Sequence, residues 1–128
     1  MGSQQLLLII LGVIIVAIAI AFGIYVFDTM AVSSNKDGLL NDVNDVSSDA
    51  FAYYQRAQIM GGGNGSFTGY RMNSAYVSNE HGDISVTIQG GGRSIDIVAT
   101  SRNGYGTITA TINDRGQLST PVFTGEFQ

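Results

Sequence analysis

The chain contains no cysteine and no tryptophan, and it has a single proline among its 128 residues. Without cysteine, disulfides, thiolate metal sites and thiol nucleophiles are excluded. Six basic residues against ten acidic ones give a net charge of -4, and the basic residues are scattered singly along the chain. We therefore expect no nucleic acid to be bound through charge, because such binding needs a basic surface.

Side chains suited to catalysis are also scarce. His81 is the only histidine, and it lies in Asn79-Glu80-His81-Gly82-Asp83, a stretch with the composition of a turn. A metal site needs several converging ligands, and no Gly-x-Ser-x-Gly motif occurs that would indicate a hydrolase. We expect a solvated loop histidine, no catalytic residue, no cofactor and no metal, so that the protein is not an enzyme. A pH-sensing or metal-binding His81 is the minor alternative.

Three aspartates, Asp42, Asp45 and Asp49, recur at helical spacing. They lack the loop spacing and the central glycine of a calcium-binding hand. We interpret them as a solvated acidic helix face, and a weak calcium contact is the minor alternative.

Charge is absent from one long segment, residues 6–27, which has no charged or amide side chain. A helix of about 20 residues spans the hydrocarbon core of a bilayer. No lysine or arginine precedes the segment and no small-residue cleavage site follows it, so it does not resemble a secretory signal peptide. The sequence predicts a hydrophobic transmembrane or filament-core helix over residues 1–28.

A second helical pattern covers residues 29–60. Ser33 to Gly38 interrupt it with poor helix formers, so we expect a bend, a frayed stretch or a short break there. The glycines of residues 61–65 should end the helix. The apolar residues recur at spacings of three and four, which is typical of an amphipathic helix with one buried face: Leu39, Leu40, Val43, Val46, Ala50, Phe51, Tyr54 and Ala57.

The rest of the chain changes to a period of two. Residues 84–88, 95–99 and 108–112 alternate apolar with polar side chains and are separated by turns rich in glycine and asparagine. This pattern predicts an antiparallel meander. Residues 74–77 are a candidate leading strand, and residues 117–123 a trailing edge strand, because Pro121 cannot donate to a central ladder.

Together the patterns predict an α+β fold. A long protruding N-terminal helix would pack its C-terminal half on a small antiparallel β-meander, since the helix carries the only other apolar stripe. The expected organisation is a hydrophobic helix at 1–28, an amphipathic helix at 29–60, and a glycine-rich loop with an antiparallel sheet at 61–128. Residues 29–128 would form one globular head.

This arrangement resembles the type IV pilins and pilin-like proteins. Residues 2–16, Tyr53-Tyr54-Gln55-Arg56 and residues 60–67 look like a bacterial pilin-like subgroup. The resemblance implies a structural subunit, the major pilin, of a type IV pilus-like extracellular filament. Its implied partners are other copies of itself in a helical homopolymer, the inner membrane before assembly, the prepilin peptidase and the pilus assembly machinery. Its implied location is the inner membrane and then the cell-surface filament.

The resemblance also implies site residues. No basic leader is visible, so we expect a chain that is already processed or truncated, with processing and N-methylation at Met1 or Ser3. The early glutamate of the family is missing, because its place is taken by Gln5 or Leu7 in the two alternatives. The residues expected in the filament core are Gln5, Leu6, Leu7, Leu8, Ile9, Ile10, Leu11, Val13, Ile14, Ile15, Ile18, Phe22, Tyr25 and Phe27.

Two further features leave alternatives open. Asn64-Gly65-Ser66 matches the N-glycosylation pattern, which makes Asn64 a candidate modification site. The membrane-length helix also fits a single-pass anchor for a small β domain that binds a partner. A minor pilin or a secretion pseudopilin, which primes or caps a filament, is the other alternative.

Overall fold

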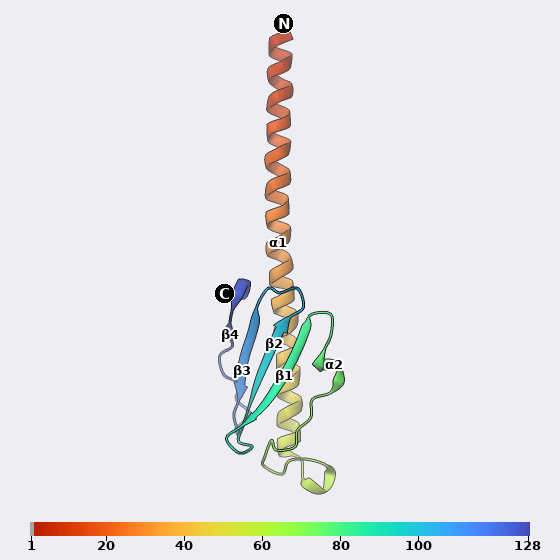
Figure 1. Ribbon diagram of the computed structural model, residues 1–128, viewed down its shortest axis with the longest axis vertical. Helices are drawn as coiled ribbons and strands as arrows, with labels where there is room; N and C mark the ends of the chain where they lie inside the picture. Colours follow the sequence, from red (N-terminus) through yellow and green to blue (C-terminus); the bar gives the residue numbers. More distant parts are fainter. Residues whose placement is uncertain (1) are drawn as a thin grey trace. The chain divides into compact units, whose positions relative to one another are not determined.

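The computed structural model describes residues 2–128. The chain divides into two compact units, one that ends at Ser33 and one, Ser34–Gln128, that we call the head. The fold is α+β, as the sequence predicts, with a long N-terminal helix followed by a four-stranded antiparallel sheet (Figure 1).

Helix α1 runs without interruption over Gly2–Gln55, so the predicted break at residues 33–38 is wrong. Asn35, one of the poor helix formers in that stretch, is only 8% exposed. Its side-chain amide donates to the His81 carbonyl oxygen at 3.0 Å and accepts from Ser101 Oγ at 2.7 Å. These contacts with distant residues offset the low helix propensity of the stretch.

The end of α1 lies at Gln55, earlier than predicted, and the following residues fold back over it. The amide of Gly63 donates to the Tyr53 carbonyl and that of Gly65 to the Tyr54 carbonyl, both at 2.8 Å. Carbonyls in the last turn of a helix need such partners, because the helix itself supplies none. The short helix η1, Gln58–Met60, lies within this turn. The glycine-rich loop therefore caps the helix as predicted.

The sheet has the order β1-β2-β3-β4, with β1 at Gly82–Gln89, β2 at Ser94–Ser101, β3 at Thr107–Ile112 and β4 at Val122–Phe123. The register pairs Val86 with Ile97 and Ile97 with Ala110, which puts the apolar residues on one face. The three predicted strands of the meander are confirmed as β1, β2 and β3. The trailing strand is confirmed as an edge strand, but only its last two residues form β4, and Leu118 makes an isolated bridge with Ile112 of β3.

The predicted leading strand at residues 74–77 is wrong. Helix α2, Ser74–Val77, occupies this position, and the Asn73 side chain caps it by accepting from the Ala75 amide at 3.0 Å. Asparagine is a favoured N-cap residue, so a local capping contact overrides the β propensity of Tyr76 and Val77. An isolated bridge between Ser78 and Asp83 then leads the chain into β1.

The head core lies between α1 and one face of the sheet (Figure 1). Because the buried residues of α1 recur every three or four positions, one stripe of the helix faces the strands. Phe67 and Phe127 close the two ends of this layer and are almost fully buried. The other buried apolar residues are Leu39, Val43, Val46 and Ala50 on α1, Tyr70 in the loop before α2, and Ile84, Ile95, Ile97, Ala99, Ile108, Ala110 and Ile112 on the strands.

Candidate functional site: an exposed apolar helix and a polar cluster

The N-terminal segment of α1 is apolar and fully exposed. Every residue from Gly2 to Met30 is exposed, and none of the most apolar part of the helix is buried within the chain. The residues predicted for the filament core, from Gln5 to Phe27, all belong to this exposed segment. The segment is long and apolar enough to cross a membrane.

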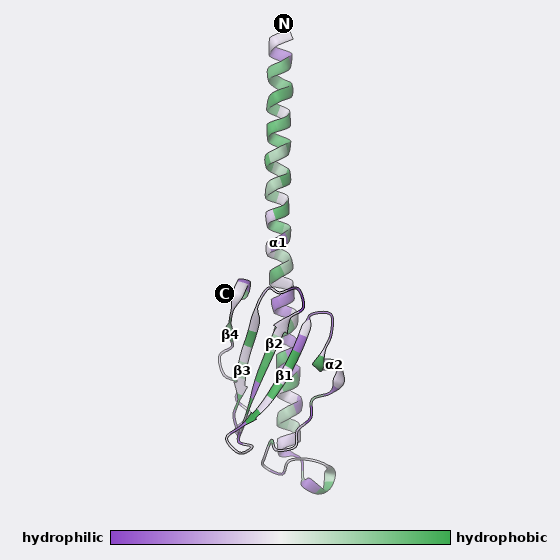
Figure 2. Ribbon diagram, viewed as in Figure 1, coloured by the Kyte–Doolittle hydropathy of each residue, from purple (hydrophilic) through white to green (hydrophobic). Residues whose placement is uncertain are grey.

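No side of this segment is polar. Residues 6–11 are all leucine or isoleucine, and six consecutive residues cover more than one turn of a helix. Figure 2 shows hydrophobic colouring along the N-terminal half of α1. A helix that is apolar all round is stable only when it is covered, because exposed apolar surface costs about 25 cal/mol per Å². The segment therefore needs a bilayer or other helices around it.

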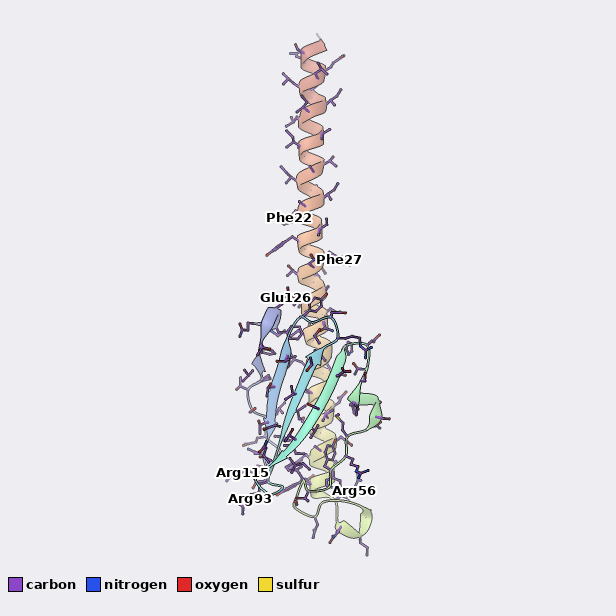
Figure 3. All side chains as sticks on the ribbon, in the orientation of Figure 1. Phe22, Phe27, Arg56, Arg93, Arg115 and Glu126 are labelled. Carbon is purple, nitrogen blue, oxygen red and sulfur yellow. The ribbon has the colours of Figure 1, made fainter. Side chains whose placement is uncertain are left out.

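Aromatic side chains mark the C-terminal end of the apolar segment. Phe22, Tyr25 and Phe27 are 66%, 68% and 73% exposed, and Figure 3 labels Phe22 and Phe27 on this part of α1. Asp28, the first charged residue of the chain, follows them directly. Aromatic rings favour the interface between hydrocarbon and water, so this order fits a helix that leaves a membrane near Asp28.

The first turn of α1 carries amides in place of a carboxylate. Ser3, Gln4 and Gln5 are exposed, and the turn has no acidic residue. Of the two expected processing positions, Ser3 lies in the helix, whereas Met1 lies outside the described residues. Gln5 offers only a neutral hydrogen bond, which is weaker than a charge-assisted one.

A polar cluster joins α1 to the sheet, and it changes the interpretation of His81. The residue lies in the turn before β1, but its ring is not free in solvent: Nδ1 lies 3.0 Å from Asp42 Oδ2. The ring also packs on Gly38, where an added Cβ would lie 2.7 Å from it. The expected loop position of His81 is confirmed, but its side chain is only 36% exposed, because α1 supplies both a partner and a place for the ring.

Asp42 belongs to the same cluster and not to a solvated face. Its Oδ2 also accepts a hydrogen bond from Asn79 Nδ2 at 2.8 Å. The Asn79 Oδ1 in turn accepts from the backbone amides of His81 and Gly82. Throughout residues 2–128, every buried side-chain nitrogen and oxygen has a hydrogen-bond partner. The cluster thus fixes the turn before β1 onto the helix.

Asp49 also has a specific partner. Tyr70 Oη donates to Asp49 Oδ2 at 2.8 Å, and the Tyr70 ring meets Tyr53 edge-on with centroids 5.5 Å apart. Burial, followed by the hydrogen bond to Asp49, raises the pKa of the Tyr70 phenol well above its ordinary value. Asp45 and Asp49 are both exposed, as the predicted solvated face requires, whereas Asp42 is half-buried. Within the described residues no hydrogen bond involves the Asp45 side chain.

The polar cluster does not bring enough ligand side chains together for a metal site. Within the described residues, no group of three or more His, Cys, Asp or Glu side chains could hold a metal ion. The pairing of His81 with Asp42 could not be predicted from local patterns, because the residues lie 39 positions apart. Gly38 is the one local indication, because a glycine inside a helical pattern can mark a position where another group packs closely on the helix.

Replacing Gly38 with alanine should destabilise the head when His81 is present and stabilise it when His81 is alanine. With the ring in place, the new Cβ would force His81 away from Asp42. Without the ring, alanine gains up to about 1 kcal/mol of helix propensity over glycine. Urea unfolding of the four variants in detergent measures this double-mutant cycle. The same sign in both backgrounds would contradict the packing of His81 on Gly38.

The candidate glycosylation residue, Asn64, is exposed in the loop that caps α1. Its φ of 48° is left-handed, and its backbone amide donates to the Arg56 carbonyl at 2.9 Å. The side chain is therefore accessible although the backbone is held.

Comparison of the chain with protein-family models, with curated proteins and with solved structures found no match. The function is therefore argued from the residues and their geometry.

Proposed function

We propose that the chain is a structural subunit, the major pilin, of a type IV pilus-like extracellular filament. The observation that carries the proposal is the apolar segment of α1, which is exposed on every side from Leu6 to Phe27 and continues as the helix that covers the sheet. The subunit self-assembles through this segment and performs no catalysis.

Two surroundings satisfy the apolar segment: the hydrocarbon core of a bilayer and a bundle of identical helices. Before assembly the segment lies in the inner membrane, with the head outside the hydrocarbon. Assembly moves the segment into the bundle. Because lipid tails are as apolar as leucine, this transfer gains little from the hydrophobic effect and depends on helix packing. The pilus assembly machinery therefore has to extract each subunit.

The small residues of the segment favour such packing. Gly12 and Gly23 have nothing within 4 Å of an added Cβ, so the fold of the single chain does not require glycine at either position. Glycines in apolar helices let neighbouring backbones approach closely. A filament core gives both residues a role that a lone membrane anchor does not.

The missing early glutamate affects how neighbours find their register. The prepilin peptidase would generate an N-terminus at Met1 or Ser3, which is then methylated, and no carboxylate in the first turn is available to pair with it. Register in the core therefore depends on side-chain packing and on hydrogen bonds of Gln4 and Gln5.

Shearing of cells that express the chain tests the proposal. We expect filaments in the sheared fraction that bind an antibody against the head in electron micrographs, with this chain as their main component. Mass spectrometry of the N-terminal peptide identifies the mature start. A single-pass anchor would leave all of the chain in the membrane fraction, and a minor pilin would be a trace component of a filament built from another protein. Either result would contradict the proposal.

A further inference from the structure

The strand register defines two ends of the head. At the Ser34 end, Gly82 at the start of β1 pairs with Ser101 at the end of β2, and Asn35 of α1 binds Ser101. At the Gln55 end, the turn after β1 lies beside the end of α1: the Phe67 amide donates to the Gly92 carbonyl, and the Phe67 ring lies 4.7 Å from Tyr54.

Three of the five arginines gather at the Gln55 end. Arg56 follows α1, Arg93 lies in the turn between β1 and β2, and Arg115 lies in the loop after β3. Figure 3 labels all three at the same end of the head. They are exposed, and the ion pairs of residues 2–128 include none of them. Asp114 is the one acidic residue in these three segments.

Acidic side chains dominate the Ser34 end. Asp37 lies on α1, Glu80 and Asp83 flank the start of β1, and Glu126 lies in the helix η2, Gly125–Phe127. Figure 3 labels Glu126 at the end opposite the three arginines. The Glu80 and Asp83 side chains are 89% and 71% exposed.

Two basic residues offset only part of this acidic charge. Arg102 Nη2 lies 3.8 Å from Asp83 Oδ1, and Lys36 Nζ lies 4.1 Å from the centroid of the Phe123 ring. Four acidic residues thus face two basic ones at the Ser34 end, whereas at the Gln55 end three arginines face Asp114 and Asp96, the third residue of β2. The head is therefore positive at one end and negative at the other.

Exposed apolar side chains accompany the arginines. Ile59 and Met60 in η1 are 96% and 72% exposed, and η1 begins two residues after Arg56. Exposed apolar side chains of this kind add apolar area to a protein interface.

We propose that the Gln55 end of one head binds the Ser34 end of another copy of this chain along the filament. The inference rests on the proposed function, because copies in a helical polymer share one orientation and therefore bring opposite ends of the head together. Arg56, Arg93 and Arg115 of one copy meet Glu80, Asp83 and Glu126 of the next. Two heads with a net negative charge would otherwise repel each other. The opposite charges of the two ends favour contact between the Gln55 end of one head and the Ser34 end of the next.

Charge reversal at the two ends tests the contact in the full chain. Arg93→Glu with Arg115→Glu should lower the yield of sheared filaments by at least about tenfold, since like charges then meet at every subunit. Glu80→Arg with Glu126→Arg should do the same. Because all four residues are exposed, unfolding curves of the head should stay unchanged. The four substitutions together restore opposite charges and should restore the yield.

The outcomes separate this contact from the filament proposal. Normal filaments from either double variant would overturn the contact and leave the filament standing. Loss of filaments without recovery in the fourfold variant would also overturn it, because the arginines would then bind some other anion, such as a lipid or nucleic-acid phosphate. Absence of filaments from the unchanged chain would instead contradict the proposed function.

Discussion

Replacing Ile14 with lysine should abolish filaments and leave the head folded. Ile14 lies in the middle of the apolar segment, is 50% exposed, and belongs to a different unit from the head. In a filament core the lysine charge would be removed from water without a partner, at a cost of several kcal/mol. Identical subunits would also place lysines near one another along the core, and this repulsion adds to the cost.

Membrane insertion of the same variant should persist. A lysine at the centre of a transmembrane helix costs about 2.5 to 3.5 kcal/mol, whereas each leucine, isoleucine, valine or phenylalanine contributes roughly -0.3 to -0.6 kcal/mol. The remaining apolar residues of the segment therefore keep insertion favourable. Ile14→Leu is the matched control and should assemble as the unchanged chain does. Filaments of normal yield from Ile14→Lys, measured in sheared fractions, would contradict a core built from this segment.

Replacing Leu39 with alanine should destabilise the head by about 2 to 5 kcal/mol, which is a large share of the stability of a small domain. Leu39 is 0% exposed and is among the largest fully buried side chains between α1 and the sheet. Its neighbour Leu40 is only half-buried, so Leu40→Ala is a control of the same chemistry with a smaller expected cost. Urea unfolding of both variants provides the comparison. Equal losses would contradict the orientation of α1 on the sheet.

The elements that sequence analysis predicted correctly are those whose signal is local. The alternation of residues 84–88, 95–99 and 108–112 is visible within each segment, and all three segments form strands. The apolar length of residues 6–27 is equally local. Such patterns determine which face of an element needs burial, and the α+β class follows from them.

Each wrong prediction concerns a segment whose structure depends on a distant residue or on one capping hydrogen bond. The poor helix formers around Asn35 stay helical because Ser101 and the His81 carbonyl bind the Asn35 amide. Asn73 turns a stretch with strand propensity into α2. Helix propensity is a local property of the chain. It does not show that Asn35 binds Ser101, which lies 66 positions further along the sequence.

The candidate functional sites also divide into one with a local sequence signal and others that depend on distant residues. Composition alone predicts the apolar segment, since it depends on no contact within the chain. The charged ends of the head were missed, because Arg56, Arg93 and Arg115 are scattered in the sequence and meet only through the strand register and the turn positions. The pairing of His81 with Asp42 was missed for the same reason.

Helical reconstruction of the sheared filaments by electron cryomicroscopy would show whether the apolar segment of α1 forms the filament core. We expect a core of α-helical density in which the side chains of residues 6–27 pack against copies of themselves, surrounded by heads that each contain a four-stranded sheet. Filaments whose core lacks this segment, or sheared fractions that contain no filament of this chain, would contradict this expectation.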